Sequence, residues 1–122
     1  MYVRHTANPQ RETNDCAIRS IANATGRPWQ NVMRELCDIA IEMYDMPNST
    51  RVIDEYFYNR KIFANQPSQP TNVLQFASEH PSGRFVVCLT DHAISIIDGD
   101  YYDLVDSGKG EIVDYYEVKG EV

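Results

Sequence analysis

The hydrophobic period of the sequence changes near Arg84, and this change limits the fold more than any other feature. Before it, apolar residues recur at the three- and four-residue spacing of amphipathic helices. After it, short segments carry the alternating or continuous apolar pattern of strands, with turn residues between them. The expected helices cover residues 14–26 and 28–43, a segment opening at Ser49 or Thr50, and residues 72–79; the expected strands cover residues 85–89, 93–97, 101–105 and 112–118. Helices followed by an antiparallel sheet are typical of α+β domains.

The length and composition predict one globular domain. The chain has 122 residues, of which 43% are hydrophobic and 24% charged. These values are ordinary for a globular protein with a small core. We therefore expect a single domain over residues 1–122, with a helical part at about 14–80 and a sheet part at about 84–118.

The charge and the apolar runs exclude several classes of partner. The formal net charge is −7 without a basic cluster in the sequence, which argues against nucleic acid as the main partner. The apolar runs are too short to span a bilayer, and no apolar segment follows Met1 as in a signal peptide. Three cysteines without metal-type spacing suit a reducing compartment, so we expect a cytoplasmic protein without metal or organic cofactor.

The segment from Gln10 to Gly26 predicts a loop that runs into a helix, with Cys16 in the first turn. Asn14 is a good N-cap residue, and Gly26 is a good stop. Free N–H groups and the helix dipole favour an anion at this position, so the thiolate of Cys16 would be stabilised there. Asp15 opposes this effect because a second negative charge nearby disfavours a thiolate. A reactive Cys16 therefore needs a cationic partner.

The hairpin from Asp91 to Asp106 supplies that partner. If its loop is the three residues Asp98 to Asp100, the strand register places His92 opposite Asp106. A two-residue loop would shift the register by one residue and place His92 opposite Val105 instead. We prefer the first register because it gives an apolar face that ends in a His–Asp pair. Asp103 and Asp98 compete with Asp106 for the role of orienting the imidazole.

Together these residues form a predicted Cys16–His92–Asp106 triad. The histidine would accept the thiol proton and later protonate the leaving group, while the carboxylate holds the ring in the required tautomer. The side-chain amide of Gln10 could donate a hydrogen bond to a developing oxyanion.

This arrangement resembles the papain-like cysteine peptidase superfamily, in which Cys, His and then Asn or Asp occur in this chain order. Gln10 lies six residues before Cys16, as does the oxyanion-hole glutamine of that superfamily. The run from Gln10 to Cys16 is similar to the bacteriocin-processing peptidase domains of ABC transporters. The pairs His92-Ala93 and Asp106-Ser107 resemble the His-Ala and Asn-Ser pairs of papain, and the whole pattern looks like that of short bacterial and bacteriophage papain-like proteins.

The resemblance covers residues 10–26 and 84–118 and implies a compact papain-like fold. It implies a cysteine hydrolase that cleaves an amide or isopeptide bond of a peptide or protein through a thioester intermediate. Ala17 departs from the transporter peptidases, which have Gly after the cysteine, and Gly108 and Lys109 follow Ser107 where papain has Trp. The alternative is a catalytically inactive papain-like binding module, which would engage a host protein if the chain is of phage origin.

The remaining cysteines and histidines have simpler interpretations. Cys37 and Cys88 lie in apolar patterns and are expected to be core residues. His80 is expected at a helix C-terminus and His5 in a solvated tail. The spacing of these residues does not suggest a zinc site.

Overall fold

The computed structural model describes residues 1–6 and 14–120 and has the expected α+β class. Its elements follow the change of hydrophobic period in the sequence, with helices before Arg84 and most strands after it. Within the described residues the order is β1 (Tyr2–Arg4), α1 (Cys16–Thr25), α2 (Trp29–Met43), α3 (Thr50–Tyr58), α4 (Val73–Glu79), β2 (Arg84–Leu89), β3 (His92–Ile97), β4 (Asp100–Asp103) and β5 (Asp114–Val118).

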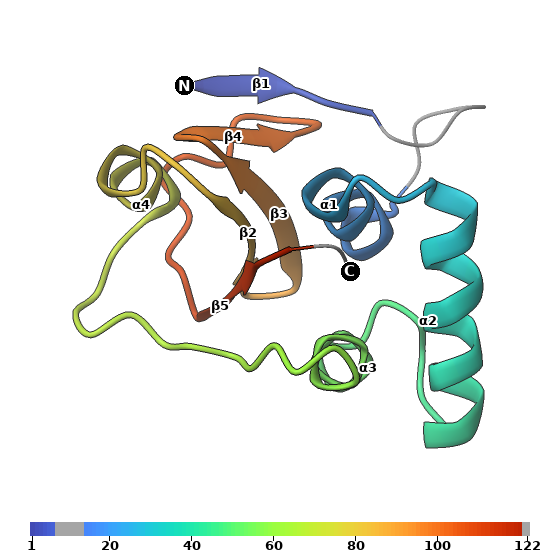
Figure 1. Ribbon diagram of the computed structural model, residues 1–122. Helices are drawn as coiled ribbons and strands as arrows, with labels where there is room; N and C mark the ends of the chain where they lie inside the picture. The colour runs from blue at the N-terminus through green and yellow to red at the C-terminus, as the bar shows by residue number, and fades with distance from the viewer. Residues whose placement is uncertain (7–13, 121–122) are drawn as a thin grey trace.

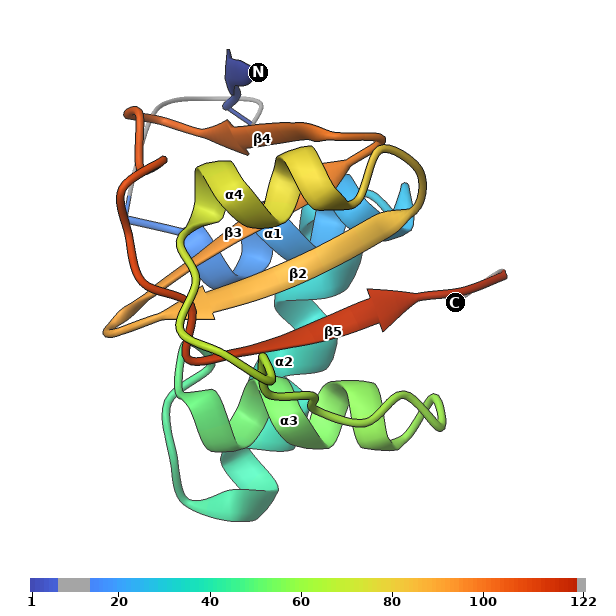
Figure 2. The ribbon, with the colours of Figure 1, turned by 90° about the vertical axis from the view of Figure 1, so that its left-hand side faces the viewer.

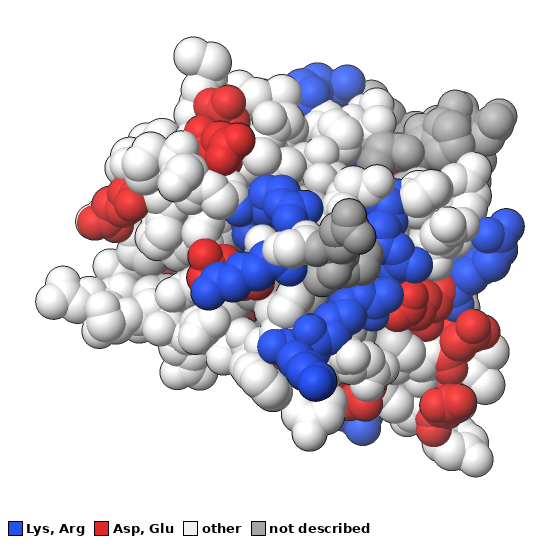
Figure 3. Space-filling view, viewed as in Figure 1, with Lys and Arg blue, Asp and Glu red and all other residues white. Residues whose placement is uncertain are grey.

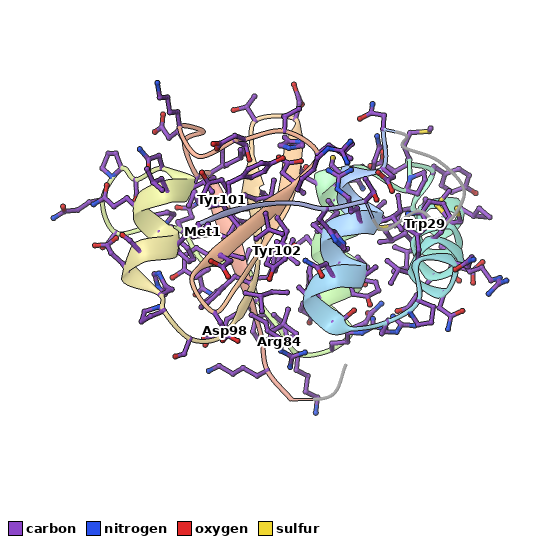
Figure 4. The ribbon with its side chains drawn as sticks, turned by 90° about the horizontal axis from the view of Figure 1, so that it is seen from above. Met1, Trp29, Arg84, Asp98, Tyr101 and Tyr102 are labelled. Carbon is purple, nitrogen blue, oxygen red and sulfur yellow. The ribbon has the colours of Figure 1, made fainter. Side chains whose placement is uncertain are left out.

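The strands form one mixed sheet in the order β1-β4-β3-β2-β5 (Figure 1). The pairs β4–β3, β3–β2 and β2–β5 are antiparallel, whereas β1 runs parallel to β4. The expected sheet of about four antiparallel strands is therefore incomplete, because it omits the N-terminal strand. Figure 4 shows Met1 above β4 beside Tyr101 and Tyr102, and the backbone N–H of Tyr101 donates to the carbonyl of Met1 at 3.0 Å.

The helices pack on both faces of this sheet. Helices α1, α2 and α3 lie on one side and α4 on the other, as Figures 1 and 2 show from two directions. The first face buries residues such as Ile21, Leu36 and Phe57 against Val86, and the second buries Phe76 against strand residues such as Ile94. In the described part of the chain, none of the helices has the length and apolar character needed to cross a membrane.

The first helix begins and ends close to the predicted positions. Gly26 follows its last residue at φ 74°, in the left-handed region that glycine adopts without strain, and its N–H donates to the carbonyl of Ala22. At the other end the expected Asn14 cap is wrong. Asp15 occupies the N-cap position and makes no side-chain capping bond. Its carboxylate is instead turned toward Arg19 and Trp29.

The β3–β4 hairpin has a shorter loop than the three residues expected from the sequence. Ile97 pairs with Asp100 and Ser95 with Tyr102, so the loop consists of Asp98 and Gly99 alone. Both residues have positive φ, 49° and 84°, as the two-residue type I′ turn requires. The predicted register, in which His92 faces Asp106, is therefore wrong. Strand β4 ends at Asp103, three residues before Asp106.

Candidate active site

The sulfur of Cys16 lies where α1 begins, against the start of β3. Cys16 is the first residue of the helix and is half-buried. Its side chain is hydrogen-bonded to His92, and Sγ accepts a hydrogen bond from the backbone N–H of Ala93. Burial raises the pKa of the thiol, but these two hydrogen bonds and the nearby cations His92 and Arg19 lower the pKa overall. The predicted meeting of Cys16 and His92 is thus present in the structure.

The imidazole of His92 lies between the sulfur and a carboxylate. Its Nε2 is 2.6 Å from Oδ2 of Asp103, which leaves Nδ1 as the ring nitrogen for Cys16. The hydrogen bond to Asp103, and next the hydrogen bond to Cys16, raise the pKa of His92 to about 9 although its partial burial opposes the charge. A lowered thiol pKa beside a raised imidazole pKa favours a thiolate–imidazolium ion pair.

The carboxylate that contacts His92 belongs to Asp103, not to the preferred Asp106. Oδ1 of Asp106 accepts hydrogen bonds from the hydroxyl of Tyr101 at 2.7 Å and from the N–H of Gly108 at 2.9 Å. It therefore stabilises the turn after β4 and does not contact His92. The reason is the two-residue loop, which places the end of β4, rather than the following turn, beside the start of β3.

Asp103 is completely buried, with 0% of its surface exposed. Burial tends to raise the pKa of this carboxyl group, but its hydrogen bond with His92, together with the backbone N–H of Leu104, keeps the pKa below its usual value. An ionised Asp103 can accept from the imidazole and hold its tautomer.

A buried guanidinium extends the site inward. Arg19 donates from Nη2 to Oδ1 of Asp103 at 3.0 Å and from Nη1 to Oδ1 of Asp15 at 2.7 Å. The indole N–H of Trp29 donates to Oδ2 of Asp15 at 2.8 Å. Arg19 is a residue of this site that the sequence did not predict. Its spacing of four residues from Asp15 was the available signal, but such pairs usually lie on exposed helix faces.

A cleft of about 420 Å³ opens beside the reactive pair. Cys16, His92 and Ala93 line one part of it, and the α2–α3 connection, including Met46 and Ser49, lines another. A substrate in this cleft would therefore meet the sulfur. Gln10, the predicted oxyanion donor, lies outside the described residues.

The other cysteines and histidines have different surroundings. Cys88 is 4% exposed and also lines the cleft, and burial and the nearby Asp114 raise its pKa. Cys37 is half-buried on α2. His80 follows the last residue of α4 as expected, but the prediction of a solvated His5 is wrong. The His5 ring is partly buried edge-on against Tyr102, and burial lowers its pKa.

Basic side chains also gather on the surface away from Cys16 and His92. Figure 3 shows basic side chains gathered on one face, with acidic side chains beside them. Arg60, Lys61 and Lys119 line a separate shallow hollow. Glu35 pairs with Arg60 and Glu117 with Lys119, so acidic groups neutralise part of this charge. Within residues 1–6 and 14–120, no group of three or more His, Cys, Asp or Glu side chains could hold a metal ion.

Comparison of the chain with protein-family models, with curated proteins and with solved structures gives no match.

Proposed function

We propose that this protein is a cysteine hydrolase of the papain-like kind, with Cys16 as nucleophile, His92 as general base and acid, and Asp103 as the residue that orients His92. The observation that carries the proposal is the continuous hydrogen-bonded row from Cys16 through His92 to a fully buried carboxylate. A cysteine that only fills the core has no need of a cationic partner. Cys88 is such a cysteine, because burial raises its pKa.

The first half of the reaction forms a thioester. The thiolate of Cys16 attacks the carbonyl carbon of an amide or isopeptide bond in the cleft, and the carbonyl oxygen takes the negative charge. Backbone N–H groups in the first turn of α1 have no acceptor within the helix and can donate to this oxygen. The protonated His92 gives its Nδ1 proton to the leaving nitrogen as the carbon–nitrogen bond breaks, so the amine departs neutral.

The second half releases the acid. The now neutral His92 takes a proton from water, and the resulting hydroxide attacks the thioester carbon. The carbon–sulfur bond breaks, Cys16 leaves as a thiolate and the ion pair with His92 is restored. An amine in place of water would give acyl transfer with the same residues.

The proposed substrate is a peptide or protein in the cytoplasm. A polypeptide fits an open cleft that lies between the reactive pair and the α2–α3 connection. The papain-like assignment is supported by the position of Gln10 six residues before Cys16 and by the chain order of Cys16, His92 and an acidic residue.

The test is the pH dependence of iodoacetamide alkylation at each cysteine, measured by mass spectrometry in the wild type and in His92→Ala. We expect Cys16 to react well below the pH of about 8.5 at which an isolated thiol ionises. We expect His92→Ala to remove this advantage, because the cation that lowers the thiol pKa is lost. Cys88 serves as the internal control in the same sample and should react slowly throughout.

A second measurement tests the attack of Cys16 on a carbonyl group. A peptide aldehyde should add to Cys16 reversibly in the wild type and not in Cys16→Ala. If Cys16 is as unreactive as Cys88 at every pH, the hydrolase proposal is wrong and a binding role for the cleft becomes the better explanation.

A further inference from the structure

The buried side of the site contains a row of charges that alternate in sign. It begins at Asp15, continues through Arg19 and Asp103, and reaches His92 and finally the sulfur of Cys16. Arg19 is 3% exposed, Asp15 4% and Asp103 0%. Three ionisable groups in this row are therefore almost completely removed from water.

Burial of such a row is costly unless each charge has a partner. Two buried carboxylates that lie close together repel each other, and a cation between them offsets this repulsion. The guanidinium of Arg19 is suited to this place because it is always charged and its planar fork donates in two fixed directions. One nitrogen meets Asp15 and the other meets Asp103.

The two carboxylate oxygens of Asp103 have different hydrogen-bond partners. Oδ1 accepts from Arg19 and from the N–H of Leu104, while Oδ2 is left for His92. This division fixes the plane of the carboxylate, and thus the direction from which it meets the imidazole. Trp29, the first residue of α2, donates to Oδ2 of Asp15, so Oδ1 of Asp15 remains available for Arg19.

We propose that Arg19 is a positioning residue of the active site: its guanidinium keeps Asp103 ionised and aimed at His92, and through them it promotes the Cys16 thiolate. The inference rests on the proposed function of Cys16 and His92 but concerns a residue that does not touch substrate. Among the described residues, several charged or titratable groups surround Cys16 and His92. They are Arg19 on α1, Asp15 at its N-cap, Asp103 on β4, Cys88 on β2, His5 after β1, and Asp45 and Asp91 in the cleft.

The experiment compares Arg19→Met with Arg84→Met. Both arginines contact α1, but the guanidinium of Arg84 donates to the carbonyls of Ala24 and Gly120, at the opposite end of the helix from Cys16. Figure 4 shows Arg84 beside Asp98 at that end of the sheet. Arg84→Met therefore reports the general cost of losing a structural arginine. Circular dichroism confirms at each pH that the variants are folded.

The readout is the rate of Cys16 alkylation against pH. With Arg19→Met, the onset should move to higher pH and the rate at about pH 6 should fall by about tenfold, the effect of one pKa unit. With Arg84→Met, the rate should change by less than about twofold. Arg19→Lys keeps a buried cation but cannot donate to both carboxylates in the same geometry, so its onset should lie between wild type and Arg19→Met.

Two outcomes separate the claims. If wild-type Cys16 alkylates at low pH and folded Arg19→Met follows the same curve, the inference about Arg19 is wrong while the proposed nucleophile stands. If Arg19→Met does not fold, a wild-type curve for Arg19→Lys overturns the inference. If wild-type Cys16 itself is unreactive, the proposed function fails before Arg19 is considered.

Discussion

Replacement of Asp103 by Asn tests the corrected triad most directly. The amide has nearly the shape of the carboxylate and can still hydrogen-bond, but it carries no charge. The contact concerned is the 2.6 Å bond from Asp103 to Nε2 of His92. The matched control is Asp106→Asn, which removes the same charge three residues further along, from a carboxylate that contacts Tyr101 and Gly108 instead.

The expected size follows from the pKa of His92. Its rise from 6.5 to about 9 corresponds to about 3 kcal/mol in favour of the imidazolium. The hydrogen bond to Asp103 is the largest cause of this rise, and the bond to Cys16 comes second. Asp103→Asn should therefore lower the titration midpoint of His92 by at least about one pH unit. Asp106→Asn should leave it within about a few tenths of a unit.

The assay follows the imidazole C2–H resonances by NMR as the pH is raised. The protein has only three histidines, and the resonance of His92 is assigned by its loss in His92→Gln. Asp103→Asn also leaves Arg19 with only one of its two buried negative charges, so urea unfolding should show a stability loss of about 3 kcal/mol or more. The titration is therefore performed at low temperature, with circular dichroism to confirm folding.

Either of two results would refute this reasoning. One is a His92 midpoint that does not move in folded Asp103→Asn. The other is a midpoint that falls in Asp106→Asn and not in Asp103→Asn, which would restore the register expected from the sequence.

Two further predictions concern the stability of the buried row. Trp29→Phe removes the indole donor of the buried Asp15 and should destabilise the fold by about 1–3 kcal/mol in urea unfolding, and an unchanged midpoint would contradict the packing described. The raised pKa of His92 contributes stability that is fully present below about pH 6.5 and is lost as the pH rises toward about 9. In a Cys16→Ser background, which removes the titrating thiol, His92→Gln should therefore destabilise the protein more at pH 6 than at pH 9; an equal loss at both pH values would show that His92 is not preferentially charged in the folded state.

The helices and most strands could be predicted because their signals are local. The apolar spacing that indicates α2 or β2 lies within the element itself, and burial of that pattern against a sheet face then selects it. Strand β1 was missed because it has only three residues and pairs in parallel with β4, about a hundred residues later. The local sequence of Tyr2–Arg4 does not predict pairing with so distant a strand.

The correct register of the β3–β4 hairpin could have been predicted from its turn residues. Asp98-Gly99 is a typical type I′ pair, and both residues adopt positive φ in the structure. The longer loop was preferred because it gave His92 an acidic partner at Asp106. The correct turn also gives it one, since the end of β4 brings Asp103 to the same imidazole. The turn residues Asp98 and Gly99 therefore indicate the register of this hairpin better than the position of an acidic partner for His92 does.

Arg19 could not have been placed from the sequence in the same way. On α1 it forms an ordinary i,i+4 pair with Asp15, which is typical of a solvated helix face. Its burial depends on Asp103, which lies 84 residues away and arrives only when β4 joins the sheet. The sequence therefore does not show that the Arg19–Asp15 pair is buried next to Asp103; only the tertiary structure does.

The positions of the site residues within their elements explain why the register matters so much. Cys16 is the first residue of α1, His92 the first of β3 and Asp103 the last of β4. Because β3 and β4 are antiparallel, the first residue of β3 and the last residue of β4 lie at the same end of the hairpin. The N-terminus of α1 lies against that end. A shift of one residue in the hairpin would exchange the side chains between the two faces of the sheet and remove the carboxylate from the imidazole. The short turn at Asp98-Gly99, at the far end of the hairpin, therefore determines which acid His92 meets.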